Sequence, residues 1–373
     1  MRSNYLNKKI LLSVLLTGLV LLVACGSGAS NAITVRVDYD HDEFATQFIR
    51  YFPDRIQVHP GDTVIFEQDW TGEAHTVTFG TKVEEVLEIT KPLFAEWGAT
   101  PIEKVPAEVL QAYFTAECSL PVLYSQCEAP AEESPEDSVE APTEAINQTI
   151  AQPCLIVEGS IPVDGSPCQT QELTPFTGAE LYYNSGFLPF EGETSFELNL
   201  ADTIAPGEYN FFCSVHGSAH SGVLEVVSAD QPIPTPADVN RETREQLNEV
   251  VEPFREAYQQ AQSGAFVYNE ESFRGPFTGL VDPRVEGLLN EFVPETLEVA
   301  VNEPVTWLMF GPHTISFDVP EYFPIYETLD DGTIRVNEEI YVPAGGAPEV
   351  GEPDGPEPVI VDGGTYDGSG LWS

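Results

Sequence analysis

The chain has 373 residues, a length that predicts about two domains of roughly 100–200 residues each. Its 61 acidic residues outnumber 15 basic ones and give a net charge of −46, which argues against binding to nucleic-acid phosphates because few cations are present to displace counterions. Hydrophobic residues make up 42% of the chain and aromatic residues 10%, so packed cores are expected rather than wholesale disorder.

The N-terminus has the pattern of an export signal. Lys8 and Lys9 precede an apolar run over residues 10–24, and the run stops at Cys25. This run is too short for a comfortable membrane span, and a basic segment followed by an apolar one is typical of secretory signals. We therefore expect the rest of the chain to be exported.

The four residues Leu-Val-Ala-Cys at 22–25 resemble the lipobox of bacterial and archaeal lipoproteins. The resemblance implies a signal peptide over 1–24, a lipidated Cys25 and a tether over 25–31. The protein would then be anchored in the lipid bilayer and face the periplasm or the extracellular side, provided that two or more acyl chains are attached. An uncleaved anchor helix and an ordinary secretory signal are the alternatives.

Short segments with alternating apolar and polar residues follow, separated by turns such as Pro60-Gly61-Asp62. Alternation of this kind is typical of half-buried strands, and short strands between turns favour a β-sandwich. We therefore predict an all-β domain over 32–230. Its strands are expected at 33–37, 56–58, 63–66, 75–79, 195–200, 208–213 and 222–227.

An insertion over about 81–180 interrupts this β pattern. It has a possible helix at 107–116 and an acidic, Pro-rich stretch at 128–142 that we expect to be irregular. Four cysteines fall in the insertion and suit two disulfides in an oxidising compartment. Pairing Cys118 with Cys127 and Cys154 with Cys168 closes the shortest loops, although four cysteines allow three pairings.

A Pro-rich and helical linker is expected over 231–279. Apolar residues from Leu247 to Tyr258 recur at helical spacing, and Asp238 is a candidate N-cap. Pro253 should kink or divide this helix because it lacks an amide hydrogen. We interpret the helix as a packing element between two domains.

Residues 280–373 contain a partial internal repeat. Residues 53–66 align with 294–307, and after a three-residue contraction His75-Thr-Val-Thr-Phe aligns with His313-Thr-Ile-Ser-Phe. The sequence ends before any counterpart of the Cys213 segment, so we expect either a truncated chain or a second copy without the metal-binding end. His313 is therefore a possible remnant of a second site.

The chemistry of the chain is concentrated at Cys213-Ser-Val-His216-Gly-Ser-Ala-His220, between two predicted strands. A thiolate and an imidazole separated by two residues can turn toward one metal, with His75 supplied by a neighbouring strand. One Cys, two His and a weak fourth ligand form a trigonal site suited to copper electron transfer. His41 and His59 are expected at the surface.

These motifs resemble the cupredoxin family, the plastocyanin- and azurin-like blue copper proteins. The matching residues are His75 on an early strand, Pro206-Gly-Glu-Tyr before the last loop, Cys213 and His216, together with Pro60-Gly-Asp-Thr-Val. The resemblance covers about 32–80 and 181–227, with a second partial copy over about 286–373. It implies a Greek-key β-sandwich with one mononuclear copper site, followed by a second, incomplete cupredoxin-like β domain over 280–373. It also implies that electrons pass through an exposed edge of His216.

The sequence departs from the family at the axial ligand, where His220 stands in place of the usual Met. Met309, the one methionine besides Met1, belongs to the second copy. We expect His220 to be the fourth ligand, with an open axial position, a water or a carbonyl as alternatives. A nitrogen donor is harder than a thioether and should favour Cu(II). A Cys/His₃ set could also hold Zn²⁺.

The leading hypothesis is a non-catalytic, membrane-tethered electron carrier that works with a redox protein. The acidic surface either steers a cationic partner or serves solubility in a salty habitat. Copper storage, delivery or sensing is the first alternative. A two-domain oxidase or an enzyme like copper nitrite reductase is less favoured, because the six histidines include no His-x-His or His-Cys-His motif for a trinuclear cluster.

Overall fold

The structure is a computed structural model. The predicted signal peptide, Cys25, the tether and Cys127 lie outside the described residues. No helix in the described part of the chain is long and apolar enough to cross a membrane. The described residues are 32–39, 41–68, 71–98, 100, 104–122, 147–170, 172–188, 194–264, 266–268, 271–282, 284–311, 313–319, 326–328, 334–336 and 364–372.

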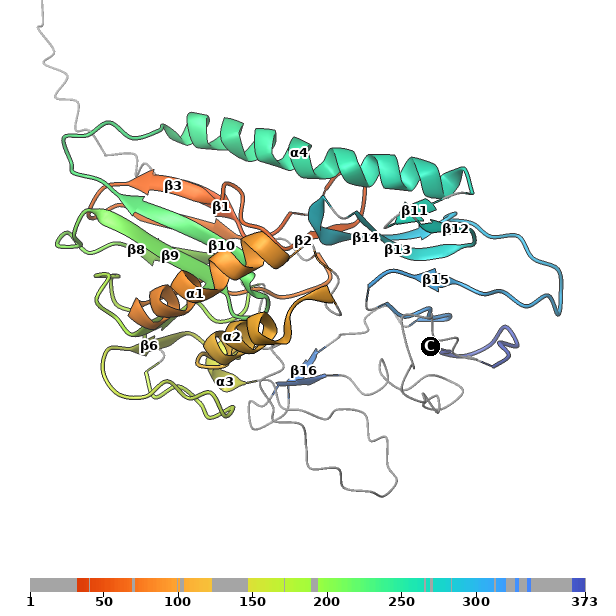
Figure 1. The fold of residues 1–373 in the computed structure, drawn as a ribbon, viewed down its shortest axis with the longest axis horizontal. Helices are drawn as coiled ribbons and strands as arrows, with labels where there is room; N and C mark the ends of the chain where they lie inside the picture. The colour runs from red at the N-terminus through yellow and green to blue at the C-terminus, as the bar shows by residue number, and fades with distance from the viewer. Residues whose placement is uncertain are drawn as a thin grey trace, which may run out of the picture. The chain divides into compact units, whose positions relative to one another are not determined.

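Two sheets form the predicted sandwich (Figure 1). In the smaller sheet β4 is central and pairs in parallel with β1 and antiparallel with β8. The larger sheet has the order β3-β10-β9-β5-β7-β6. The bounds are β1 Ile33–Arg36, β3 Arg55–Val58, β4 Thr63–Glu67, β5 Thr78–Phe79, β6 Cys154–Ile156, β7 Tyr182–Asn184, β8 Ser195–Asn199, β9 Gly207–Cys213 and β10 Gly217–Val226.

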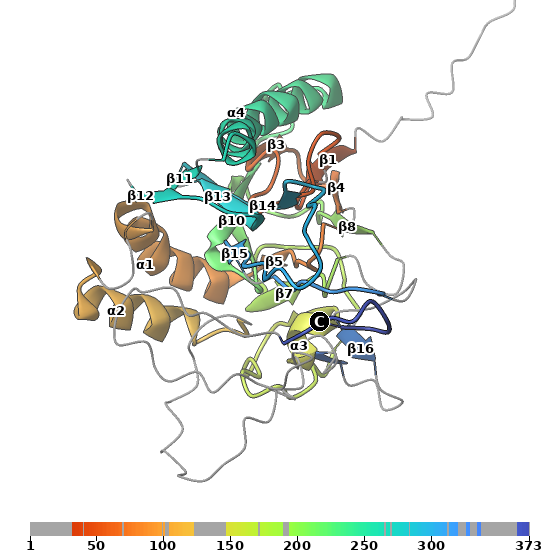
Figure 2. The same ribbon diagram turned by 90° about the vertical axis from the view of Figure 1, so that its right-hand side faces the viewer.

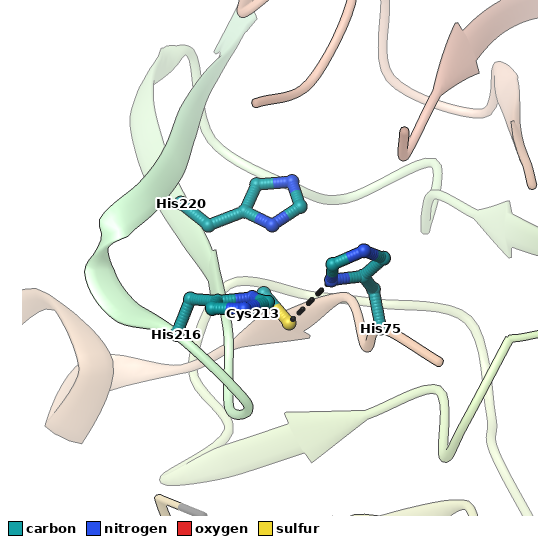
Figure 3. A group of neighbouring side chains, drawn as sticks. All are labelled: His75, Cys213, His216 and His220. Carbon is teal, nitrogen blue, oxygen red and sulfur yellow. Dashed lines mark hydrogen bonds between the residues drawn. The ribbon is translucent and has the colours of Figure 1, made fainter. Parts of the chain in front are cut away.

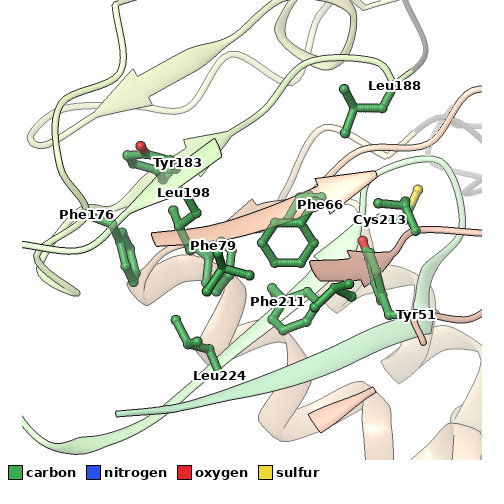
Figure 4. Packing of buried hydrophobic residues seen from close by; sticks show 14 of the residues in the cluster. Tyr51, Phe66, Phe79, Phe176, Tyr183, Leu188, Leu198, Phe211, Cys213 and Leu224 are labelled. Atoms are coloured by element: carbon green, nitrogen blue, oxygen red, sulfur yellow. The ribbon is translucent and has the colours of Figure 1, made fainter. Parts of the chain in front are cut away.

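The core of the sandwich is built from alternate residues of these strands. Along β4 and β10 every second side chain is buried, as expected for strands with one face toward a core. Phe66, Phe79 and Phe211 are fully buried and form edge-to-face and tilted ring contacts in the centre (Figure 4). The predicted all-β sandwich is therefore confirmed, and its predicted strands lie within a residue or two of the expected positions, except that β5 is shorter and β10 begins five residues earlier.

The insertion adds helices to one face of the larger sheet. α1 (Thr81–Trp97) and α2 (Ala107–Glu117) lie side by side (Figure 2), and a short α3 (Gln148–Ala151) precedes β6. The helix predicted at 107–116 is α2, whereas α1 was not predicted. Gly80 joins β5 to α1 at φ 129°, and a Cβ there would lie 2.4 Å from the Leu181 carbonyl oxygen, so this abrupt junction requires glycine.

Cysteine pairing in the insertion follows the shortest-loop prediction where the structure describes it. Cys154 and Cys168 form a disulfide, which confirms that pair. Cys118 is also disulfide-bonded, and Cys127, its predicted partner, lies outside the described residues. The Cys154–Cys168 bond ties residue 168 to the edge strand β6, because Cys154 is the first residue of that strand.

Removing the Cys154–Cys168 bond by a double substitution to alanine is expected to lower the free energy of unfolding by about 3 kcal/mol. The bond closes a loop of sequence separation 14, and the main effect is the greater entropy of the unfolded chain. Urea unfolding under non-reducing conditions measures the change. Val157→Ala, at an exposed neighbouring position, is the matched control, and a loss below about 1 kcal/mol in the double variant would contradict the expectation.

A second hydrophobic core lies beside the sandwich. It is formed by α4, which packs against the sheet β15-β13-β14-β2. β2 comes from the N-terminal part of the chain and pairs antiparallel with β14, so residues 44–52 belong partly to this core. The bounds are β2 Thr46–Phe48, α4 Pro236–Gln262, β11 Phe266–Tyr268, β12 Glu271–Phe273, β13 Phe277–Asp282, β14 Val285–Val293, β15 Leu308–Met309, β16 Tyr326–Thr328 and β17 Ile334–Val336.

The helix predicted in the linker differs from expectation at its N-terminal end. Its N-cap is Thr235, and Asp238 is the N3 partner in a reciprocal capping box rather than the cap. Pro253 lies inside α4 without dividing it. α4 contacts β1 as well as β13 and β14 (Figure 1), and this packing along its length holds the helix together.

Residues 297–299 and 305–307, which align with the first-copy strands at 56–58 and 63–66, do not form strands. In the first copy the equivalent strands are β3, which pairs with β10, and β4, which pairs with β1 and β8. The described residues hold no corresponding neighbours for the second copy. Leu297, Val299 and Val301 are consequently exposed, since an alternating segment becomes a strand only where it finds a partner.

Candidate metal centre

Four side chains predicted from the sequence as metal ligands lie together at one end of the sandwich (Figure 3). They are His75, Cys213, His216 and His220, and one ligand atom from each lies within 4.8 Å of the others. Three of the four are fully buried, and the His216 side chain is 12% exposed. A group of one sulfur and three nitrogen donors at this spacing can hold a single transition-metal ion.

The strands bring these residues together from distant parts of the chain. Cys213 is the last residue of β9. The backbone of His75 pairs with Leu188 through two hydrogen bonds of 2.8 Å, and its Nδ1 lies 3.6 Å from the Cys213 sulfur. β10 then runs back along β9 with a register break between Gly217 and Ser221. His220 lies within this irregular stretch, which re-aims its side chain toward Cys213.

The Cys213 sulfur lies in an environment that favours the thiolate. The backbone amides of Thr76 and Val215 each donate to Sγ at 3.3 Å. Burial alone would raise the pKa of Cys213, but the neighbouring imidazoles of His216, His220 and His75 hold it well below its usual range. Because a thiolate rather than a thiol binds metals, this environment prepares Cys213 for ligation.

His75 and His216 each have one ring nitrogen bonded to a carboxylate. His75 Nε2 lies 3.3 Å from Asp38 Oδ2, and its Nδ1 lies 3.6 Å from Cys213 Sγ. His216 Nε2 lies 3.1 Å from Glu73 Oε2. Burial lowers the pKa of His75, yet its hydrogen bonds to Asp38 and Cys213 raise that pKa to about 10, so metal binding at Nδ1 should release a proton.

The surroundings of His220 test whether a metal fits this site. Both of its ring nitrogens are buried and neither has a hydrogen-bond partner. Burial lowers the pKa of His220 to about 4, so the ring is neutral at pH 7 and has a free lone pair. Buried polar groups without partners are rare in folded proteins, and a metal bound beside Cys213 would satisfy one of these nitrogens.

The loops that carry the ligands are fixed by further hydrogen bonds. Ser214 N donates to Thr76 Oγ1 at 2.7 Å, and the hydroxyl of Tyr51 donates to the Thr76 carbonyl at 2.6 Å. The Tyr51 ring also packs against His220, with 4.2 Å between ring centroids. These contacts hold His75, Cys213 and His220 in a fixed arrangement, as a site that changes charge with little rearrangement requires.

The insertion also contacts the ligand loop. Glu117, at the end of α2, is buried and accepts a hydrogen bond of 3.0 Å from Ser218 N, and Tyr113 OH lies 2.9 Å from Ser218 Oγ. Gly217 has φ 62°, and a Cβ there would lie 2.0 Å from the Glu117 carboxylate. α2 therefore fixes the turn between His216 and His220.

The remaining histidines do not join this group. His313 is half-buried on the segment after β15, and burial lowers its pKa. His41 and His59 are partly exposed, and His59 Nε2 lies 2.8 Å from the Gln231 carbonyl oxygen. Asp38, Glu73 and Glu117 were not predicted, because single carboxylates carry no signal in a chain with 61 acidic residues.

Comparisons with known proteins give matches to solved structures alone. No family model matches the chain, and no curated protein sequence matches it. A mutant fern plastocyanin is 16% identical, with a TM-score of 0.20, over 52% of this chain and 99% of its own. Auracyanin from Roseiflexus castenholzii is 15% identical, with a TM-score of 0.23, over 54% and 99%. Auracyanin A from Chloroflexus aurantiacus is described as a "blue" copper protein and is 12% identical, with a TM-score of 0.23, over 52% and 98%.

Proposed function

We propose that this chain is a mononuclear copper protein that carries single electrons outside the cytoplasm. The observation that carries the proposal is the buried group of Cys213, His75 and His216 with His220, whose two ring nitrogens have no hydrogen-bond partner. Copper supplies one-electron chemistry when bound by such a set of one thiolate and several imidazoles. No catalytic residues are proposed.

The roles of the residues follow from their surroundings. Cys213 supplies the thiolate, and the amides of Thr76 and Val215 stabilise its charge. His75 and His216 supply Nδ1, because their Nε2 atoms are engaged by carboxylates. His216 is the one ligand with an exposed edge, so it provides the route by which an electron enters or leaves.

The proposal includes export and a membrane tether through Cys25. It is supported by the apolar run that ends at this residue and by the Cys154–Cys168 disulfide, which is typical of oxidising compartments. The partner is proposed to be a redox protein, and the net charge of −46 suits a cationic one. The rate of electron transfer should then fall as ionic strength rises.

Visible and EPR spectroscopy of the copper-loaded protein tests the proposal directly. One equivalent of Cu(II) is expected to give an intense thiolate-to-copper absorption band and a single mononuclear EPR signal. Reversible voltammetry with fast self-exchange should accompany them. Failure to bind copper, or an EPR signal without a thiolate band, would contradict the proposed site.

Copper storage, delivery or sensing remains a second candidate, because three imidazoles and one thiolate also suit Zn²⁺. Competition between Zn²⁺ and Cu(I) at the same site, followed by voltammetry, separates the two functions. A tightly held ion that does not cycle reversibly would favour storage or sensing over electron transfer.

Replacing His220 with methionine is expected to raise the reduction potential and to change the thiolate absorption band. Methionine is a softer donor than imidazole, so it stabilises Cu(II) less. Spectroelectrochemistry measures both effects. Ser195→Ala, at the exposed start of β8, is the control. A His220→Met protein with an unchanged spectrum and potential would show that His220 is not a ligand.

A further inference from the structure

His75 and His216 each have their Nε2 atom next to a carboxylate, and the two carboxylates come from different parts of the fold. Asp38 lies just after β1, and its side chain is fully buried beside His75. Glu73 lies in the loop before His75, and its side chain is 11% exposed beside His216. Both carboxylates are therefore largely shielded from water, where their charge acts strongly on a neighbouring ion.

Each carboxylate determines which ring nitrogen is available to a metal. An ionised carboxylate can only accept hydrogen bonds, so the Nε2 atom that faces it must carry the hydrogen. In a neutral ring the lone pair is then at Nδ1. For His75 this atom lies 3.6 Å from the Cys213 sulfur, which is on the metal side of the ring.

Other hydrogen bonds hold Asp38 rigidly in this position. Its Oδ1 accepts from the amides of Tyr39 at 2.6 Å and Phe48 at 2.7 Å, and its Oδ2 accepts from Thr71 Oγ1 at 2.6 Å as well as facing His75. This number of partners explains how a carboxylate can be buried completely. It also places Asp38 between the sandwich and β2.

Glu73 is held in a similar way from the second core. Gln47, on β2, donates through Nε2 to the same Glu73 oxygen that faces His216, and Gln68 Nε2 donates to the Glu73 carbonyl at 2.7 Å. β2 belongs to the sheet with β14. The second core therefore supplies a contact that orients Glu73 toward a predicted ligand.

We propose that Asp38 and Glu73 are a pair of positioning residues that present His75 and His216 through Nδ1 and bias the site toward the divalent state of its metal. The inference rests on the proposed copper site. Two carboxylates and a thiolate place three negative charges around one ion, and this field stabilises Cu(II) more than Cu(I). The site is thus a low-potential electron donor, and its partner is an acceptor of higher potential.

The test separates the charge of Glu73 from its hydrogen bond. Glu73→Gln keeps an acceptor oxygen and removes the charge, whereas Glu73→Ala removes both. We expect Glu73→Gln to change the ratio of Cu(II) to Cu(I) affinity at least tenfold toward Cu(I), which is a rise of about 59 mV in potential for a one-electron couple. Glu73→Ala should show this rise and in addition a loss of metal affinity of roughly 10–100-fold.

A second readout does not depend on electron transfer. Long-range ¹H–¹⁵N NMR of the Zn-loaded protein should show Nδ1-bound, Nε2-protonated rings for His75 and His216. Asp38→Asn should raise the potential in the same direction as Glu73→Gln, and where that buried variant does not fold, the Glu73 variants carry the test. Glu225→Gln is the control. It removes a charge from β10, where Glu225 forms an ion pair with Arg55, and it should leave the potential unchanged.

Several results would overturn the inference. They are an unchanged potential in Glu73→Gln, an equal shift in Glu225→Gln, or Nε2 coordination at both rings. These outcomes are distinguishable from failure of the proposed function. If wild-type protein shows no thiolate-to-copper band, the proposed copper site itself is wrong. A normal band together with a reduction potential that does not change in the variants contradicts only the roles of Asp38 and Glu73.

Discussion

Substitution of Cys213 by serine is expected to abolish the intense visible absorption of the copper-loaded protein. The Cys213 side chain is fully buried, and its sulfur receives two backbone hydrogen bonds that stabilise a thiolate. A serine hydroxyl in the same place stays protonated, because burial opposes its ionisation and its intrinsic acidity is far lower. The variant therefore lacks the strongest donor of the site.

Metal affinity should fall in Cys213→Ser by more than the roughly 10–100-fold that loss of an outer hydrogen-bond partner costs. Competitive titration with a Cu(I) chelator measures this change, and visible spectroscopy measures the band. Ser195→Ala, on the exposed start of β8, is the control for handling and folding. Intense thiolate-like absorption retained in Cys213→Ser would mean that another residue supplies the sulfur or that the metal binds elsewhere.

The site could be predicted from the sequence because its ligands are rare residues in a fixed pattern. With six histidines and two methionines in the chain, Cys213, His216 and His220 stand out, and the strand at 75–79 supplies His75. The carboxylates behind them could not be predicted in the same way. Asp38 and Glu73 are ordinary members of a large acidic population, and only the folded chain brings them next to His75 and His216.

The buried residues of α1 have the spacing of a helix in the sequence, although this helix was not among those predicted. Val83, Val86, Leu87 and Thr90 recur at helical spacing, and all four are buried against the sheet. By contrast, the pairing of residues 46–48 with β14 has no local signature, because a strand of three residues is too short to show a period. Long-range pairing of this kind depends on partners that only the fold supplies.

The internal repeat illustrates the opposite case, in which a clear pattern does not give the corresponding structure. Leu297 and Val299 match Ile56 and Val58, yet they are exposed, while Ile56 and Val58 are buried between β10 and the core. Sequence similarity preserved the alternation of apolar residues. It could not preserve the neighbouring strands, and a strand without hydrogen-bonded neighbours is not stable in water.

The structure connects the two cores through one short segment, residues 46–52. Phe48 and Phe52 are fully buried in the second core, where Phe48 stacks on Phe254 of α4 with 5.8 Å between ring centroids. Tyr51, between them, is buried in the sandwich core and contacts His220. Damage to the second core should therefore reach the metal site through the backbone of this segment.

Phe254→Ala is accordingly expected to lower the free energy of unfolding of the whole unit by about 3–5 kcal/mol. The side chain is fully buried, so its removal loses transfer free energy and leaves a cavity beside Phe48 in the second core. Urea unfolding followed by circular dichroism and by copper absorption should give transitions that move together, because residues 46–52 are shared.

The matched control is Glu249→Ala, at an exposed position of the same helix, which should change stability by no more than about 0.5 kcal/mol. If the two probes separated in Phe254→Ala, with circular dichroism lost first and copper absorption retained, the cores would be independent. Coincident transitions would instead mean that α4 and its core stabilise the site through Tyr51 and Phe48. The second core would then be required to keep His220 in place, whether or not it binds a metal of its own.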